Sequence, residues 1–123
     1  MINIDEIRDW IESFGFGASE YCVGSFKGEN TNIIAVFEVD AGDDEQAYDS
    51  THFTRAIDLV IHWNDDYNET DRKALEIYKT LFRKYNFKIN NKQISFIVVS
   101  PVKDEYKDEF GIYNRSIRIK FIQ

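Results

Sequence analysis

The sequence predicts an α+β protein: a mostly antiparallel sheet with two helices packed on one face. Two segments, one near the N-terminus and one after residue 68, carry apolar residues at helical spacing on one side only. Shorter segments between and after them are rich in the β-branched and aromatic residues that favour strands. Because each helix has a single apolar stripe, one sheet can receive both helices. The expected element order is α-β-β-β-α-β-β.

Length and composition bound the class of protein. A chain of 123 residues fits a single domain, residues 1–123, and a hydrophobic content of 43% predicts a folded core. The N-terminal segment is acidic and lacks the basic start of a secretory signal. No segment approaches the ~20 apolar residues that span a bilayer. Cys22 is the only cysteine, so no internal disulfide can form and a reducing compartment is expected.

The first helix is predicted from its cap as well as from its stripe. Asn3 can cap the helix, and Glu6, three residues later, can complete a capping box. Gly15 and Gly17 then supply the end of the helix. A one-faced helix of this kind is expected to cover a sheet. Its apolar stripe consists of Ile4, Ile7, Ile11 and Phe14.

Three strands are predicted before the second helix. Residues 20–27 form a short strand, and residues 32–40 form a strand that is apolar on both faces, which favours a central position. Residues 41–51 form a polar, acidic loop that is long for a hairpin. Residues 53–63 alternate, with Arg55 on the apolar parity, where it can snorkel or pair with an acid. The other residues of this apolar parity, which share one face of the strand with Arg55, are Phe53, Ile57, Leu59, Ile61 and Trp63.

The second helix is predicted to run from the cap Asn68 to Asn86. Basic residues in its last turn suit the helix dipole. Its continuous apolar stripe consists of Ala74, Ile77, Tyr78, Leu81, Phe82 and Tyr85. Its outer face carries Arg72, Lys73, Glu76, Lys79, Arg83 and Lys84.

Two more strands are predicted in the C-terminal part. Residues 92–100 form a strand that Pro101 ends, and residues 102–111 form a charged loop. Residues 112–122 close the chain as an alternating strand. In that strand the apolar side chains of Ile117, Ile119 and Phe121 point one way, and the basic side chains of Arg118 and Lys120 point the other way.

Charge is distributed unevenly along the chain. The net charge is −7, which argues against a general nucleic-acid binder. Residues 1–71 hold 17 acidic and 3 basic residues, whereas residues 72–123 hold 5 acidic and 12 basic residues. The two halves therefore carry −14 and +7. This split can give one acidic and one basic surface, suited to docking between unlike partners, unless the fold interleaves the halves and mixes the charges.

No constellation in the sequence indicates catalysis or a bound cofactor. The loop acids Asp43, Asp44 and Glu45 lack the alternating oxygens and central glycine of a calcium loop, so no metal site is expected. His52 and His62 would lie about 33 Å apart on an extended strand. With Cys22 they make no zinc pattern. No P-loop, dinucleotide-binding or serine-hydrolase motif is present, and Cys22 is interpreted as a core residue.

Two exposed charged segments are the predicted protein interface. One is the basic outer face of the second helix, and the other is the acidic loop at 41–51. The alternative for each is a solvated surface without a partner. Exposure alone selects these residues, which are Asp43, Asp44, Glu45, Arg72, Lys73, Lys79 and Arg83.

The order of these segments resembles a known family. The chain contains a short acidic helix, then IIAVFEVD, an Asp/Gly loop, and DSTHFTRAIDLVIHW with its internal Arg55. An N-E-T turn at 68–70, the helix KALEIYKTLF and the final GIYNRSIRIKFI follow. Over nearly its whole length this order is similar to the small tail-terminator, or tail-completion, proteins of long-tailed bacteriophages, many of which carry the label minor capsid protein.

The resemblance implies a structural role in the virion of a phage or prophage. It implies an α+β subunit, made in the cytoplasm of the bacterial host, that forms a hexameric ring on the last ring of tail-tube protein. The ring would stop tube growth and join the head, so the implied partners are the subunit itself, the tail-tube protein and a head-completion or connector protein. The resemblance implies no cofactor, no catalytic residue, no membrane partner and no sequence-specific nucleic-acid contact.

Two other functions stay open from the residues alone. The acidic residues 1–71, with a loop rich in Tyr and Asp, also suit a small inhibitor of a basic protein, such as a toxin-immunity protein. A small enzyme that uses Cys22 or the acidic loop is the third hypothesis.

Overall fold

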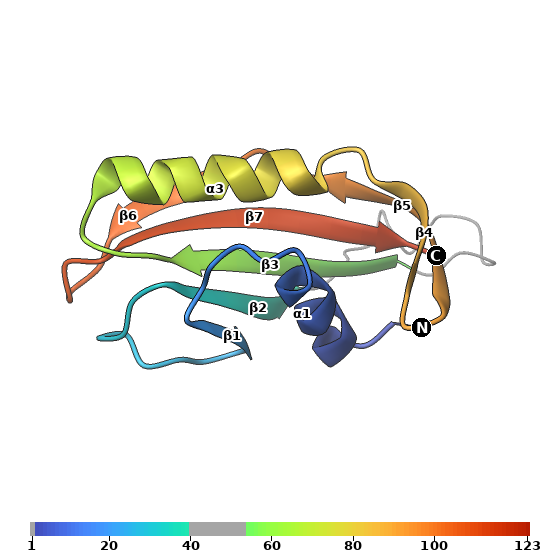
Figure 1. Cartoon of the computed structure of the whole chain (residues 1–123), viewed down its shortest axis with the longest axis horizontal. Helices are drawn as coiled ribbons and strands as arrows, with labels where there is room; N and C mark the ends of the chain where they lie inside the picture. Colours follow the sequence, from blue (N-terminus) through green and yellow to red (C-terminus); the bar gives the residue numbers. More distant parts are fainter. Residues whose placement is uncertain (1, 40–53) are drawn as a thin grey trace.

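The computed structural model describes residues 2–39 and 54–123, apart from the side chains of residues 54 and 103–105. Within these residues it confirms the predicted α+β class, with two helices and a mostly antiparallel, curled sheet of seven strands (Figure 1). The helices are α1 (Ile4–Glu12) and α3 (Tyr67–Leu81). The strands are β1 (Glu20–Val23), β2 (Ile33–Val39), β3 (Thr54–His62), β4 (Tyr85–Ile89), β5 (Lys92–Val99), β6 (Lys103–Lys107) and β7 (Tyr113–Ile122).

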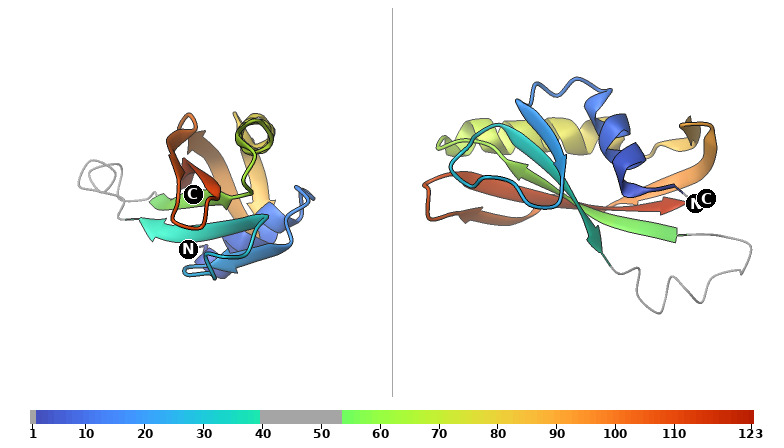
Figure 2. Two further views of the ribbon diagram at one scale, coloured as in Figure 1. Left: turned by 90° about the vertical axis from the view of Figure 1, so that its left-hand side faces the viewer. Right: turned by 90° about the horizontal axis from the view of Figure 1, so that it is seen from below.

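The strands follow the order β1-β2-β3-β7-β5-β4, with β6 paired to β7 as well. Only β1 and β2 are parallel, and every other pair is antiparallel. The long strand β7 pairs with β3 along one edge and with β6 and then β5 along the other. Both helices lie on the same face of the sheet, as predicted, because their buried side chains belong to one hydrophobic core (Figure 2).

Helix α1 begins as the sequence predicts. The Asn3 side chain accepts a hydrogen bond from the Glu6 backbone at 2.9 Å, and the Glu6 carboxylate accepts one from the Asn3 backbone at 3.0 Å. This capping box satisfies two backbone donors that a helix start leaves unpaired. The helix contacts β1, β2 and β4, so it fills the space between the two edges of the curled sheet.

Helix α3 begins two residues earlier than predicted and also ends earlier. Its cap is Asp66 rather than Asn68, and it ends at Leu81 rather than at Asn86. Phe82 is extended, and Arg83 has a φ of 62°, so the backbone leaves the helix there. The prediction that Phe82 and Tyr85 continue the buried stripe was wrong, because both side chains are exposed.

The sequence did not predict two of the strands, β4 and β6, and each has a local physical cause. β4 and β5 form a hairpin whose two-residue loop is Asn90-Asn91, with φ values of 49° and 68°. Positive φ at both positions is the type I′ geometry that matches strand twist, and Asn tolerates it. β6 lies in the predicted charged loop at 102–111, where the chain resumes pairing with β7 beyond Pro101.

The core lies between the helices and the concave face of the sheet. The parity predicted for β3 is confirmed for Ile57, Leu59, Ile61 and Trp63, all of which are buried. Arg55, on the same parity at the start of β3, pairs with Glu38 and donates to the Ile2 carbonyl at 3.2 Å, as predicted for an arginine at this position. The largest contributors from the other elements are Ile34 and Val36 of β2, Ile117, Ile119 and Phe121 of β7, and Ile77 and Leu81 of α3.

Replacing a buried residue of α3 should destabilise the protein far more than replacing its exposed neighbour. Ile77→Ala removes a fully buried side chain and should lower the free energy of unfolding by about 2–5 kcal/mol. Leu75→Ala, two residues earlier on the exposed side, should change it by less than about 0.5 kcal/mol. Urea denaturation measures both changes, and equal losses would contradict the packing described.

Candidate functional site

The sheet order keeps the acidic and basic halves of the chain apart. β1, β2 and β3 come from residues 1–71, which carry −14, and lie on one side of the β3–β7 pair. β7, β5, β4 and β6 come from residues 72–123, which carry +7, and lie on the other side. The fold therefore does not interleave the two halves in the sheet. Five acids of the first half, Asp40, Asp43, Asp44, Glu45 and Asp49, lie outside the described residues.

Ion pairs join the halves where they meet. Arg118 of β7 lies opposite Asp58 of β3 and donates to both carboxylate oxygens, at 2.8 Å and 3.1 Å. A bidentate pair of this kind fixes geometry as well as charge. The buried Arg115 lies 3.8 Å from the Asp71 carboxylate. A third pair, between Glu6 of α1 and Lys92 of β5, also joins an acid of the first half to a base of the second half.

Three of the four basic residues predicted as interface are exposed. Arg72 and Lys79 lie on the exposed side of α3, and Arg83 follows its end, where its guanidinium lies over the Phe82 ring at 5.1 Å. Two exposed apolar side chains, Leu75 at 41% and Phe82 at 44%, lie in the same part of the chain. The outer face of α3 is therefore a mixed basic and apolar surface, which is more typical of a contact surface than a purely charged helix face is.

Lys73, unlike the other three basic residues, is only partly exposed and is held by contacts within the chain. Its ammonium donates to the Phe16 carbonyl at 2.7 Å and lies 3.1 Å from the Glu76 carboxylate and 5.2 Å from the centroid of the Trp63 ring. These contacts fasten α3 to the turn after α1. The other predicted interface residues, Asp43, Asp44 and Glu45, lie outside the described part of the chain.

A row of exposed apolar residues crosses the C-terminal half of the sheet. Tyr85 of β4 pairs with Phe96 of β5, and Phe96 pairs with Ile122 of β7. Tyr85 is 75% exposed, Phe96 45% and the nearby Val98 47%. The sequence did not predict this row, because Tyr85 fits the apolar stripe of the second helix and was assigned to it. Adjacent exposed apolar side chains on a sheet mark a contact surface more often than isolated ones do.

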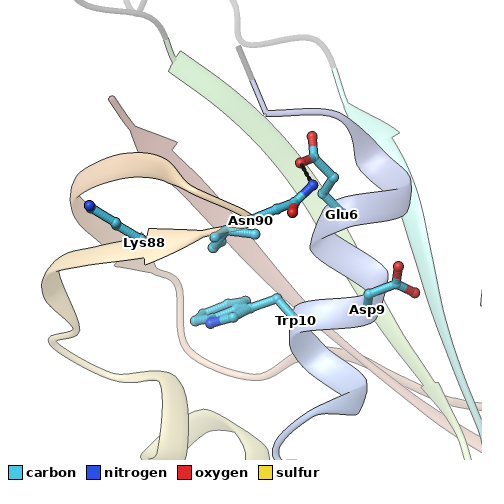
Figure 3. Close-up of a pocket in the computed structure, with 6 residues that line it drawn as sticks. Glu6, Asp9, Trp10, Lys88 and Asn90 are labelled. Carbon is cyan, nitrogen blue, oxygen red and sulfur yellow. Dashed lines mark hydrogen bonds between the residues drawn. The ribbon is translucent and has the colours of Figure 1, made fainter.

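A groove of about 330 Å³ lies between α1 and β4 (Figure 3). Its polar centre is the buried Glu6, whose carboxylate accepts hydrogen bonds from the Lys92 ammonium and the Asn90 amide, each at 2.6 Å. Hydrogen bonds from Lys92, the Asn3 backbone and Asn90 lower the pKa of Glu6 to about 2. Because its oxygens are already engaged, this carboxylate fastens α1 to the β4–β5 hairpin rather than offering a base. The lining residues are Glu6, Asp9, Trp10, Lys88, Ile89 and Asn90.

Two of the side chains considered for catalysis, Cys22 and His62, lie in the described part of the chain. Cys22 is half-buried in β1, and burial, with the nearby Glu20 charge, raises the pKa of its thiol. Both ring nitrogens of His62 lie within hydrogen-bond distance of oxygen atoms, so neither is open to a substrate. Among the described residues, no three His, Cys, Asp or Glu side chains are grouped so that they could hold a metal ion. None of the described helices has the length and apolarity to cross a membrane.

Comparisons with known proteins add no family. No protein-family model matches the chain, and no curated protein matches it.

Acid should remove the stabilisation that Glu6 provides. Because the pKa of Glu6 falls from 4.5 to about 2 in the folded protein, its contribution is present above about pH 4.5 and is lost as the pH falls toward 2. Melting temperatures measured from about pH 6 down to about pH 2 should fall more steeply for the native chain than for Glu6→Gln. Glu12→Gln, an exposed change on the same helix, should follow the native curve. Parallel curves for the native chain and Glu6→Gln would contradict this role.

Proposed function

We propose that this chain is a structural assembly protein of a long-tailed phage or prophage, which caps the tail tube, stops its elongation and forms part of the head–tail joining interface. The order of segments in the sequence, which resembles that of tail-terminator proteins, supports the proposal. The α+β fold with both helices on one face is compatible with it.

The observation that carries the proposal is the separation of charge across the β3–β7 border. A terminator has to present different surfaces to the tube and to the head. A subunit whose acidic and basic strands lie on opposite sides of its sheet offers two such surfaces, each with its own preferred partner. If strands of the two halves alternated in the sheet, acidic and basic residues would be mixed over the whole surface. In the described sheet the strands of the two halves do not alternate.

Two surfaces of the basic half are the proposed contacts. The first is the outer face of α3, with Arg72, Lys79 and Leu75, together with the exposed Phe82 and Arg83 just after the helix. The second is the row formed by Tyr85, Phe96 and Ile122 on the sheet. Each combines apolar area with nearby charge, and apolar anchors with a polar rim are the usual composition of protein interfaces.

The alternative is a small acidic inhibitor of a basic protein, such as a toxin-immunity protein. The acidic half, β1 to β3 with α1, is the feature that favours it. Gene neighbourhood separates the two proposals, because a terminator gene lies among head and tail genes and an immunity gene lies beside a toxin gene.

Loss of the gene tests the proposed function in its phage. Deleting it should give tails of uncontrolled length that carry no heads, because nothing stops the tube or accepts the connector. Electron microscopy of induced lysates measures tail length and head attachment, and a plasmid copy of the native gene should restore normal particles. Normal virions from the deletion strain would refute the proposal.

Charge reversal on α3 tests whether its outer face is one of the contacts. Arg72→Glu combined with Lys79→Glu keeps the buried side of α3 and should lower the infectious titre of complemented phage by about tenfold or more. The matched control is Lys88→Glu, which reverses a charge in the same basic half but on β4. If both variants complement as well as the native gene, the outer face of α3 is not a contact.

A further inference from the structure

His62 lies at the end of β3, within a buried polar cluster. Its register partners are Ile33 of β2 and Asn114 of β7, and the ring is 1% exposed. The adjacent Ile61 belongs to the core between sheet and helices. Because successive side chains on a strand point to opposite faces, His62 lies on the face away from the helices. There the segment between β1 and β2 contributes Phe26, whose ring centroid lies 4.7 Å from that of His62.

Both ring nitrogens of His62 face oxygen atoms. Nδ1 lies 2.7 Å from the side-chain oxygen of Asn114 and 3.4 Å from a carboxylate oxygen of Asp108. Nε2 lies 2.9 Å from the backbone carbonyl of Gly28. A carbonyl or carboxylate oxygen only accepts, so each nitrogen needs a proton to make its hydrogen bond.

The orientation of Asn114 is fixed by its other contacts. Its amide nitrogen donates to the Asp108 carboxylate and to the Ile112 carbonyl, each at 3.0 Å. Turning the amide over would place its oxygen against these two acceptors, so the oxygen has to face His62. Turning the imidazole over would place carbon atoms against Asn114 and Gly28. Only an imidazole with protons on both nitrogens satisfies every group in the cluster.

We propose that doubly protonated His62 is a proton-dependent clasp that fastens the segment between β1 and β2 to the turn between β6 and β7. When the ring loses a proton, one nitrogen lone pair faces an oxygen inside a buried site, which is costly. The hydrogen bond from Nε2 to Gly28 is the weaker of the two, because the Asp108 carboxylate stabilises a proton on Nδ1. The segment at residues 24–32 is therefore released as the pH rises.

The surroundings of the ring are consistent with a positive charge. Among the side chains that the structure describes at the ring, Asp108, in the turn after β6, is charged, whereas β7, β2 and the β1–β2 segment contribute the uncharged Asn114, Ile33 and Phe26. Burial acts to raise the pKa of Asp108, but hydrogen bonds from Ile112, Asn114 and Phe110, together with the charge of His62, lower it overall. The Asp108 carboxylate is therefore ionised and supplies the negative charge that a protonated His62 needs.

The two segments also fit closely beside the clasp. A Cβ atom added to Gly28 would lie 2.5 Å from the Phe110 ring, so glycine allows the turn after β6 to pack directly on the β1–β2 segment. Release at Gly28 would therefore separate two surfaces that are otherwise in contact, and the change should reach beyond the ring itself.

Nuclear magnetic resonance of the full chain tests the protonation state. The chain has two histidines, so His52→Gln leaves the His62 ring as the single imidazole signal. Because both ring nitrogens face acceptor oxygens, both should carry protons at about pH 7. A ring with one protonated nitrogen from about pH 6 to about pH 8 would overturn the proposal.

Hydrogen exchange tests the release. After correction for the intrinsic pH dependence, backbone amides in residues 24–32 should exchange about tenfold faster at about pH 9 than at about pH 6. His52→Gln should keep this difference and His62→Gln should remove it. Asp108→Asn, which retains a side chain of the same shape, should shift the release to lower pH. Protection of residues 24–32 that is independent of pH in the native chain would overturn the clasp.

Discussion

The β3–β7 ladder is the interaction on which the rest of the structure depends. It runs from Thr54 opposite Ile122 to His62 opposite Asn114, and it joins the two halves of the chain. On one face it aligns Ile57 and Leu59 with Ile119 and Ile117, which form the centre of the core under both helices. On the other face the same register sets Asp58 opposite Arg118 and His62 opposite Asn114. A one-residue slip would exchange these faces, so the buried side specifies the register strongly.

The ladder also explains how the strands of the acidic half and those of the basic half are kept apart in the sheet. All strands N-terminal to the helix α3 lie on the β3 side, and all later strands lie on the β7 side. The border is closed by apolar packing on one face and by the Asp58–Arg118 pair on the other. The acidic and basic strands therefore lie on opposite sides of the β3–β7 pair, which is the property on which the proposed role in joining tube and head rests.

Sequence patterns predicted the features that depend on neighbouring residues in the chain. The capping box of Asn3 and Glu6, the alternating parity of β3 and the one-faced stripe of α3 are local, and the α+β class follows from them. The end of α3 was mispredicted because Phe82 and Tyr85 keep the helical spacing although their backbone has left the helix. The Asn90-Asn91 turn was the signal for the missed hairpin. The cluster around His62 depends on partners 34 and 52 residues away, and no local pattern announces such contacts.

Among the predicted interface residues, Arg72, Lys79 and Arg83 are exposed, and Lys73 is occupied by contacts within the chain. The sequence could not separate them, because the direction of a lysine depends on what packs beside its helix. The central claim, that this chain ends tail-tube growth, is tested most directly by electron microscopy of tail-tube protein polymerised with the purified chain. The account predicts short tubes with added density at one end. Tubes as long as those formed without the chain, and without that density, would contradict it.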